Sequence, residues 1–104
     1  MRKITQEATK AFYGGYSFRK DNTEVIINDN ARLFYLHGNC IAKKVLGDGL
    51  YINHCGWQTN TAKERLNGIL AAYRSAWIYQ KDFVWYIVKD EKETEFLDGW
   101  NRID

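Results

Sequence analysis

The chain has 104 residues, of which 45% are hydrophobic, 27% charged and 15% aromatic; this is the composition of one globular domain over residues 1–104, and it excludes two domains. Fifteen Lys and Arg against thirteen Asp and Glu leave a net charge of +2, which is too weak to indicate a nucleic-acid partner by itself. Since no stretch approaches about 18 apolar residues and residues 1–7 turn polar too early for a signal peptide, we expect a cytoplasmic protein without a membrane partner.

Charge is unevenly distributed along the chain. Residues 1–20 carry five basic residues and one acidic residue (net +4), whereas residues 81–104 carry four basic and seven acidic residues (net −3). One end would therefore suit an anionic neighbour and the other a cationic one. We expect the two ends to neutralise each other in the fold.

Two helices are predicted. The first is short, with Thr5 as its cap and Gly14-Gly15 at its end. The second covers residues 62–74, because Thr61 and Glu64 have the spacing of a capping box. Apolar side chains then follow at helical spacing in this second helix, at Leu66, Ile69, Leu70 and Tyr73.

Strands are predicted between and after the helices. Residues 23–54 alternate with a period of two, and they are divided by turn signals at Asp29-Asn30, Gly38-Asn39 and Leu46-Gly47-Asp48-Gly49. A second β unit follows, with strands at residues 77–80 and 83–89 around a turn at Lys81-Asp82, and a further short strand at 94–98. The predicted fold class is α+β: a short N-terminal helix, a four-stranded antiparallel β-meander, one amphipathic helix packed on the sheet and a C-terminal β-hairpin. The hairpin can either extend the sheet or cover it.

If the turns are short, the register assigns each side chain of the meander to one face. One face collects apolar residues and is the predicted core, with Lys43 as its exception: Val25, Ile27, Phe34, Leu36, Ile41, Val45, Leu50 and Ile52. The other face is too polar for a core and too aromatic for an idle surface: Ile26, Leu33, Tyr35, His37, Cys40, Ala42, Lys44, Tyr51, Asn53 and Cys55. We therefore expect the functional residues on this second face.

A row of polar side chains on that face has three interpretations. His37, Cys40 and Cys55, with His54 nearby on the core side, are the residue types of a zinc site. Cys40 and Cys55 could instead form a cross-strand disulfide, which a reducing cytoplasm would oppose. The third interpretation, which we favour, is two free, half-buried thiols and two hydrogen-bonded histidines, with no metal and no other cofactor.

No catalytic signature occurs in the sequence. A thiol nucleophile needs a lowered pKa, an oxyanion pocket and a third orienting group, and His37 beside Cys40 meets only the first requirement. No phosphate-binding glycine loop or metalloprotease motif is present. We expect a protein that is not an enzyme.

Aromatic residues offer two kinds of binding site. Trp57 and Trp100 lie beside glycines in loops, and with Tyr35 and Tyr51 they are the candidate contacts for a protein partner, since Trp and Tyr supply much of the energy of interfaces. The alternative is a single-stranded nucleic acid stacked on the open sheet face, with Tyr35, His37, Lys44 and Tyr51 as its contacts.

Three groups of residues have a distinctive pattern: Leu36-His37-Gly38-Asn39 with Ile41-Ala42, the run from Gly56 to Gly68, and Val84-Trp85-Tyr86-Ile87 with Asp98-Gly99-Trp100. In these segments the chain resembles a family of small uncharacterised proteins of tailed bacteriophages. The resemblance carries no activity. It implies an accessory protein in the cytoplasm of the host cell that binds and modulates a host or anti-phage defence protein. Exposed sheet edges would allow the protein to be a homodimer as well as a monomer.

Overall fold

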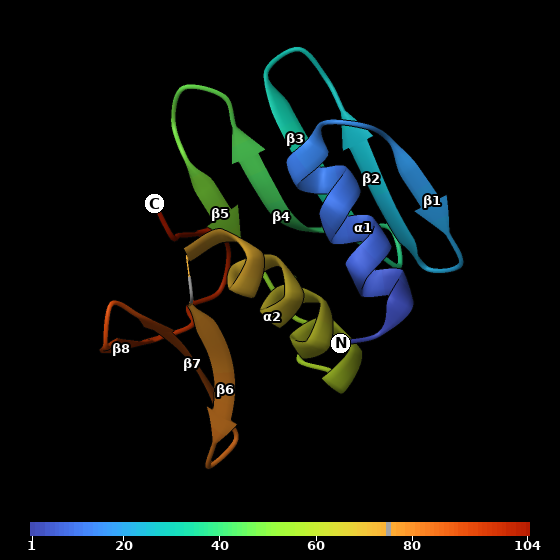
Figure 1. Cartoon of the computed structure of the whole chain (residues 1–104). Coiled ribbons are helices and arrows are strands. Elements are labelled where there is room, and N and C mark those ends of the chain that lie inside the picture. Colours follow the sequence, from blue (N-terminus) through green and yellow to red (C-terminus); the bar gives the residue numbers. More distant parts are fainter. Residues whose placement is uncertain (75) are drawn as a thin grey trace.

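A computed structural model describes residues 1–74 and 76–104, and the side chains of all of these except Tyr73 and Arg74. Within these ranges the helices are α1 (Lys3–Gly14) and α2 (Asn60–Arg74). The strands are β1 (Phe18–Lys20), β2 (Thr23–Ile27), β3 (Ala31–Leu36), β4 (Asn39–Val45), β5 (Leu50–Ile52), β6 (Trp77–Lys81), β7 (Val84–Lys89), β8 (Lys92–Glu95) and β9 (Asn101–Arg102) (Figure 1). The predicted place of Tyr73 in the helix stripe lies outside the described side chains.

The strands form two antiparallel sheets rather than one. Over the described residues, the large sheet has six strands in the order β1-β2-β3-β4-β5-β9, and the small sheet has three in the order β6-β7-β8. The predicted α+β class and the meander β2 to β5 are confirmed. The predicted C-terminal hairpin neither extends nor covers the meander, because Ile78, Trp85 and Ile87 are buried in the common core, where β6 packs on α2.

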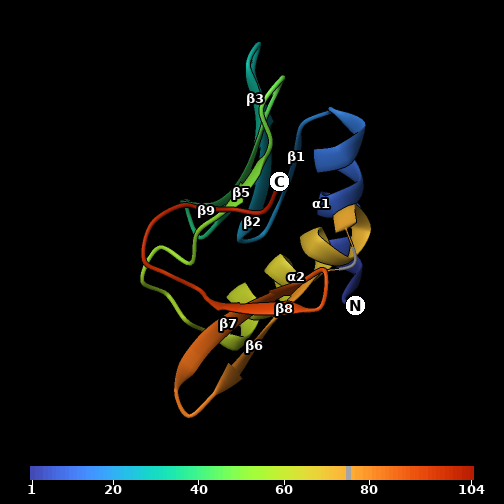
Figure 2. The same cartoon turned by 90° about the vertical axis from the view of Figure 1, so that its left-hand side faces the viewer.

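The helices lie on one side of the large sheet. Figure 2 shows α1 and α2 on the same side of the sheet, with the small sheet below α2, while the other side of the large sheet carries neither helix. This other side is called the open face below. Neither helix of the described residues has the length and apolar character needed to cross a membrane.

Both helix starts differ from the prediction. Arg2 is the N-cap of α1, and Thr5 lies inside the helix, fully buried. In α2 the cap is Thr59, whose Oγ1 accepts a hydrogen bond of 3.1 Å from the backbone N–H of Ala62. The capping box predicted at Thr61 and Glu64 is wrong because Glu64 binds α1 instead. The predicted end of α1 is confirmed, since Gly15 has the left-handed conformation of a C-cap, with φ of 76°.

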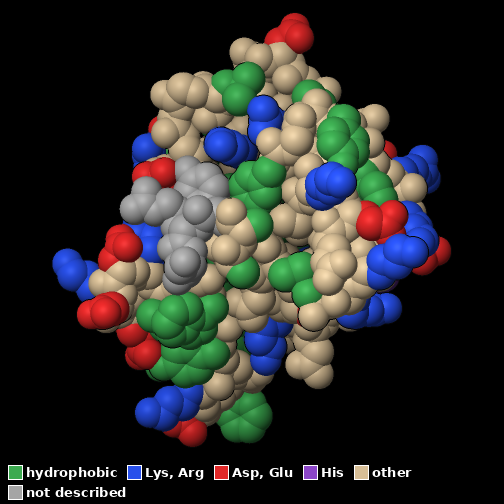
Figure 3. Space-filling model, in the orientation of Figure 1, with side chains coloured by type: hydrophobic (Ala, Val, Ile, Leu, Met, Phe, Trp, Pro, Cys, Tyr) green, Lys and Arg blue, Asp and Glu red, His purple; other side chains and the backbone are tan. Residues whose placement is uncertain are grey.

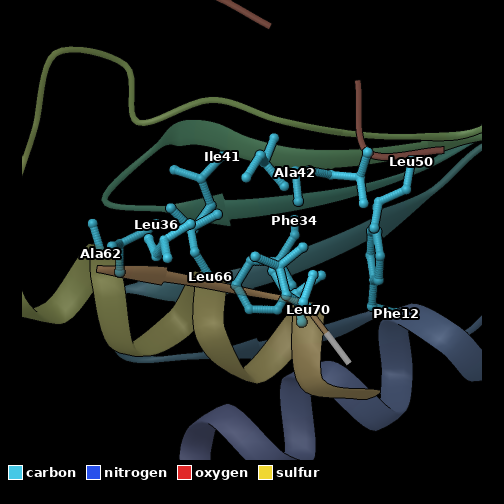
Figure 4. Packing of buried hydrophobic residues seen from close by; sticks show 14 of the residues in the cluster. Phe12, Phe34, Leu36, Ile41, Ala42, Leu50, Ala62, Leu66 and Leu70 are labelled. Atoms are coloured by element: carbon cyan, nitrogen blue, oxygen red, sulfur yellow. The ribbon is translucent and has the colours of Figure 1, made fainter. Parts of the chain in front are cut away.

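A β-bulge in β4 changes which side chains face the helices. Phe34 pairs with Ala42 and Tyr35 with Cys40, so that Ile41 is an extra residue. Ile41 and Ala42 are both buried, and both lie over α2 in the core (Figure 4). After the bulge, each side chain of β4 therefore lies on the opposite face from the one that regular alternation predicts.

This inversion corrects four predictions, for Ala42, Lys43, Lys44 and Val45. Lys43, the predicted exception in the core, lies on the open face, where its Nζ contacts the rings of Tyr51 and Trp100. Lys44, predicted on the open face, lies on the helix side, with its Nζ 6.0 Å from the ring centre of Tyr13 in α1. Val45, predicted in the core, lies on the open face opposite Ala31, and Ala42, predicted on the open face, is buried in the core. Of the other predicted core residues only Ile27 is not fully buried.

A polar network joins the two helices to β2. The guanidinium of Arg65, which is 1% exposed, donates from Nε to Thr23 Oγ1 (3.2 Å) and from Nη1 to Thr5 Oγ1 (3.0 Å) and to Glu64. Glu64 also accepts from the Thr5 hydroxyl (2.5 Å) and the Arg2 backbone N–H (3.2 Å). These bonds explain why Thr5, Thr23 and Arg65 are buried without violating the rule that buried polar groups are paired.

The carboxylate of Glu64 makes stability depend on pH. Burial by itself would raise its pKa, but the hydrogen bonds from Thr5 and Arg2 and the charge of Arg65 outweigh burial and hold the pKa below its usual 4.5. The contribution of Glu64 to the free energy of unfolding is therefore complete above its usual pKa of 4.5. It is lost as the pH falls through the lower pKa that Glu64 has in the folded protein. We expect Glu64→Gln to flatten the loss of stability between about pH 5 and 3, measured by urea unfolding. An unchanged slope in this variant would contradict the role given to Glu64.

Hairpin turns place non-glycine residues in the left-handed region. The turn between β6 and β7 consists of Asp82 (φ 51°) and Phe83 (φ 67°), one residue later than predicted, and the side chain of Phe83 is 90% exposed. His37 and Gly38 form the corresponding turn between β3 and β4, one residue earlier than the predicted Gly38-Asn39. Such turns prefer Asn-Gly.

Phe83→Gly is expected to stabilise the protein by about 0.5–1 kcal/mol. The left-handed conformation costs a side-chain-bearing residue about 1–2 kcal/mol, and the greater freedom of glycine in the unfolded chain offsets about 0.5–1 kcal/mol of the gain. Urea unfolding measures the change. Phe83→Ala is the control, because alanine keeps the strain and should give no gain; equal gains in both variants would contradict the explanation.

Candidate protein-binding face

The open face carries a cluster of aromatic and cationic side chains near the edge of the large sheet that β5 and β9 form. Register places Leu33, Lys43, Tyr51 and Arg102 opposite one another on successive strands β3, β4, β5 and β9. The Nζ of Lys43 lies 4.3 Å from the ring centre of Trp100 and 5.4 Å from that of Tyr51. The name Trp100 cluster is used below for five residues: Lys43, Asp48, Tyr51, Trp100 and Arg102.

Hydrogen bonds hold the cluster in one geometry. Tyr51 donates to Asp48 Oδ2 (2.6 Å), and Arg102 Nη1 donates to Asp48 Oδ1 (2.7 Å) and to the Tyr51 oxygen (3.0 Å). The hydrogen bond from Tyr51 is the main reason why the pKa of Asp48 is lowered, so this carboxylate is charged at neutral pH. Two cations and one anion leave the cluster with a surplus of one positive charge.

The loop before β9 presents Trp100. The side chain of Asn101 accepts from the Leu97 backbone N–H (3.0 Å) and donates to the carbonyls of Leu97 (2.8 Å) and Gly99 (3.1 Å). After the loop, Ile103 is buried, and its N–H donates to the carbonyl of Leu50 (2.8 Å). The chain is thus held in place before and after Trp100, while Trp100 itself remains 40% exposed. A side chain on such a fixed backbone loses little conformational freedom when a partner binds.

The predicted contact residues do not form one site. Tyr51 and Trp100 meet through Lys43, as described above. Tyr35 lies on the same open face, opposite Glu24 and Cys40, in a neighbouring row. Trp57, which is 62% exposed, lies elsewhere, at an apolar pocket of about 380 Å³ that Leu36 and Ile41 help to line.

The predicted row of histidines and cysteines divides into pairs. The Nε2 of His37 lies 3.3 Å from Asn22 Nδ2, whereas the Sγ of Cys55 donates to the carbonyl of Cys40 (3.2 Å). His54 is buried, accepts from the Gly56 N–H (3.0 Å) at Nδ1 and packs against Phe96. Both thiols are free. Across the described residues, no three His, Cys, Asp or Glu side chains gather in a group that would hold a metal ion, so the residues of the alternative zinc site, His37, Cys40 and Cys55, are not brought together as one.

Cys40 has the properties of a structural thiol. Burial is the main cause that raises its pKa, to about 11, against the lowering effect of the Ala42 backbone hydrogen bond. The thiol is therefore protonated at neutral pH, and the protonated form is a poor nucleophile. We expect iodoacetamide at pH 8 to modify Cys40 much more slowly in the folded protein than in urea, measured by mass spectrometry of the peptides. Equal rates would contradict this assignment.

The small sheet carries an exposed aromatic surface that was not among the predicted sites. Trp77 is 50% exposed, and the rings of Tyr79 and Tyr86 stack at 5.5 Å on neighbouring strands. Figure 3 shows hydrophobic side chains gathered over this sheet. Phe83, at the turn between β6 and β7, is also exposed. The signal was the alternation of Trp77, Ile78 and Tyr79, which assigns the two aromatic residues to one face.

Comparisons with known proteins give one match. The family described as Kyanoviridae Gp96 protein matches residues 1–102, which confirms the predicted relation to a phage protein family. Neither the curated proteins nor the solved structures contain a match.

Proposed function

We propose that this chain, which belongs to the Kyanoviridae Gp96 protein family, is a non-enzymatic accessory protein that binds a host or anti-phage defence protein in the cytoplasm of the host cell. The observation that carries the proposal is the Trp100 cluster on the open face. It combines Trp, Tyr and Arg, the residue types that dominate binding energy in protein interfaces.

Two further observations support a protein partner. The side chains of the cluster are already held by hydrogen bonds and by the Ile103 anchor, so that little conformational freedom is lost on binding. Leu33 and Ile26, which continue the row of Lys43 across β3 and β2, add apolar surface beside it. An aromatic centre with a polar rim is the usual anatomy of an interface.

The test is a capture experiment with matched variants. Tagged protein is incubated with host lysate, with and without nuclease, and the retained protein is then purified and titrated directly. Trp100→Ala is expected to weaken the binding of that partner by at least about tenfold, the loss typical of a central interface residue. Trp57→Ala and Trp77→Ala, which remove exposed tryptophans from other surfaces, are the controls and should bind normally. Equal binding by Trp100→Ala and the controls would overturn the proposal.

Single-stranded nucleic acid is the second candidate partner for this face. Tyr35, Tyr51 and Trp100 offer rings for base stacking, and Lys43 takes the place that was predicted for Lys44. Loss of all captured material after nuclease, together with affinity for an oligonucleotide that falls steeply with salt, would favour this candidate. A protein interface centred on Trp100 is expected to depend much less on salt.

A further inference from the structure

A basic pocket lies on the helix side of the molecule, away from the open face. It has a volume of about 470 Å³ and is lined by Arg2, Lys3, Lys20 and Arg65, together with Asp21 and neutral residues. The start of α1, the turn between β1 and β2, and α2 each supply part of its wall. From this arrangement we infer that the pocket binds the terminal phosphate group of a small molecule.

Arg65 is the pocket residue with the most restricted geometry. Its guanidinium is 1% exposed and is held by Thr23 through Nε and by Thr5 and Glu64 through Nη1. The remaining amino group, Nη2, has no hydrogen-bond partner among the described residues. A fixed guanidinium with unused N–H groups is suited to a phosphate oxygen, since arginine donates charge-assisted hydrogen bonds in a planar fork.

The charges around Arg65 favour an anion. Four cationic side chains line the pocket, against Asp21 in its wall, Glu64 behind Arg65 and Glu7 beside Lys20, which leaves a surplus of one positive charge. Lys20 also lies 3.8 Å from Glu7, in an exposed ion pair that is weak enough for a bound anion to replace. A terminal phosphate has a charge near −2 and three acceptor oxygens, so it can bind several of these cations at once. A carboxylate or an internal phosphodiester, each with −1, offers two unesterified oxygens.

The basic N-terminal segment explains where these cations come from. Arg2, Lys3 and Lys20 belong to the segment with net charge +4, for which we had expected neutralisation by residues 81–104. Instead the fold gathers three of the five basic residues of this segment around one pocket together with Arg65 from α2. Because these residues do not belong to the Trp100 cluster, phosphate binding and partner binding can be tested independently.

Calorimetric titration and ¹H-¹⁵N spectra with inorganic phosphate, AMP and adenosine test the inference, at a constant ionic strength of about 0.15 M. Phosphate and AMP are expected to bind saturably and to shift the Arg65 guanidinium signal, whereas adenosine is not. Tighter binding of AMP than of phosphate would identify a nucleotide as the source of the group, and equal binding would identify phosphate itself. No saturable binding, or equal binding of adenosine and AMP, would overturn the inference.

Paired variants separate a site from a general charge effect. Lys3→Gln/Lys20→Gln removes two charges from the pocket, and Lys10→Gln/Arg19→Gln removes two from the same segment outside it. The first pair is expected to weaken phosphate binding by about tenfold or more, and the control pair by less than about twofold. Equal weakening in both pairs would mean nonspecific attraction. Tighter binding of a single-stranded oligonucleotide without terminal phosphates would also overturn the inference.

Discussion

Replacing Trp85 by alanine is expected to lower the free energy of unfolding by about 3–5 kcal/mol, the range for truncating a large buried aromatic residue. Trp85 is 1% exposed, and its ring packs edge-on against His54 and Phe96, with ring centres at 6.0 and 6.1 Å. The Nζ of Lys63 in α2 lies 5.6 Å from the Trp85 ring. One side chain therefore joins the small sheet to α2 and to the loop after β5.

Urea unfolding followed by circular dichroism measures this loss, and Trp77→Ala is the matched control. Trp77 belongs to the same small sheet but is 50% exposed, so its removal should cost less than about 1 kcal/mol. Trp85→Phe should cost less than Trp85→Ala, because phenylalanine keeps a buried ring and leaves a smaller cavity. Both variants remove the Nε1–H of Trp85, which is buried and has no hydrogen-bond partner among the described residues. Similar losses for Trp85→Ala and Trp77→Ala would show that the small sheet does not depend on this contact.

Replacing Arg65 by methionine is expected to cost about 3–5 kcal/mol, the range for breaking a buried ion pair by removing one partner. Methionine keeps much of the side-chain volume, so the loss reports on charge and hydrogen bonding. It would leave the hydroxyls of Thr5 and Thr23 without the guanidinium that binds them. It would also leave Glu64 without its cation.

The double variant Glu64→Gln/Arg65→Met tests this explanation. It should be more stable than Arg65→Met, because it removes the uncompensated charge as well as its partner. Lys10→Met, a change of the same type at an exposed position of α1, is the control and should change stability by less than about 0.5 kcal/mol. If Arg65→Met and Lys10→Met cost the same, the network does not hold the helices to β2.

The sequence predicts single residues of the candidate site, but not which of them lie together in the folded protein. Tyr51 was assigned to the open face by alternation, and Trp100 was selected because an aromatic residue beside a glycine suggests an exposed loop. Their meeting at Lys43 depends on the bulge at Ile41 and on β9, which has two residues. Neither feature has a sequence pattern strong enough to predict, since a bulge differs from a regular strand by one residue.

The buried polar network was also beyond prediction. Thr5, Thr61 and Glu64 have the residue types of helix caps, and local reasoning assigned them to caps. In the folded chain Glu64 binds Thr5 and Arg2 at the start of the other helix, because packing of α1 against α2 brings this carboxylate next to the backbone N–H of Arg2 and the hydroxyl of Thr5. Long-range contacts of this kind compete with local capping and cannot be read from a four-residue window.

Most of the elements and the main core of this protein could be predicted from the sequence, but the short strands β1 and β9 could not. The second helix, the meander and the inward residues Val25, Phe34, Leu36, Leu50 and Ile52 follow from periodicity, because each pattern is local and repeats over many residues. Tertiary structure alone decided the division into two sheets, the exchange of Lys43 and Lys44 between faces, and the gathering of Arg2, Lys3, Lys20 and Arg65 around one pocket. These outcomes depend on which distant segments pack together and bury each other's apolar surface. The free energy of this burial comes from residues far apart in the sequence, so that no local pattern predicts it.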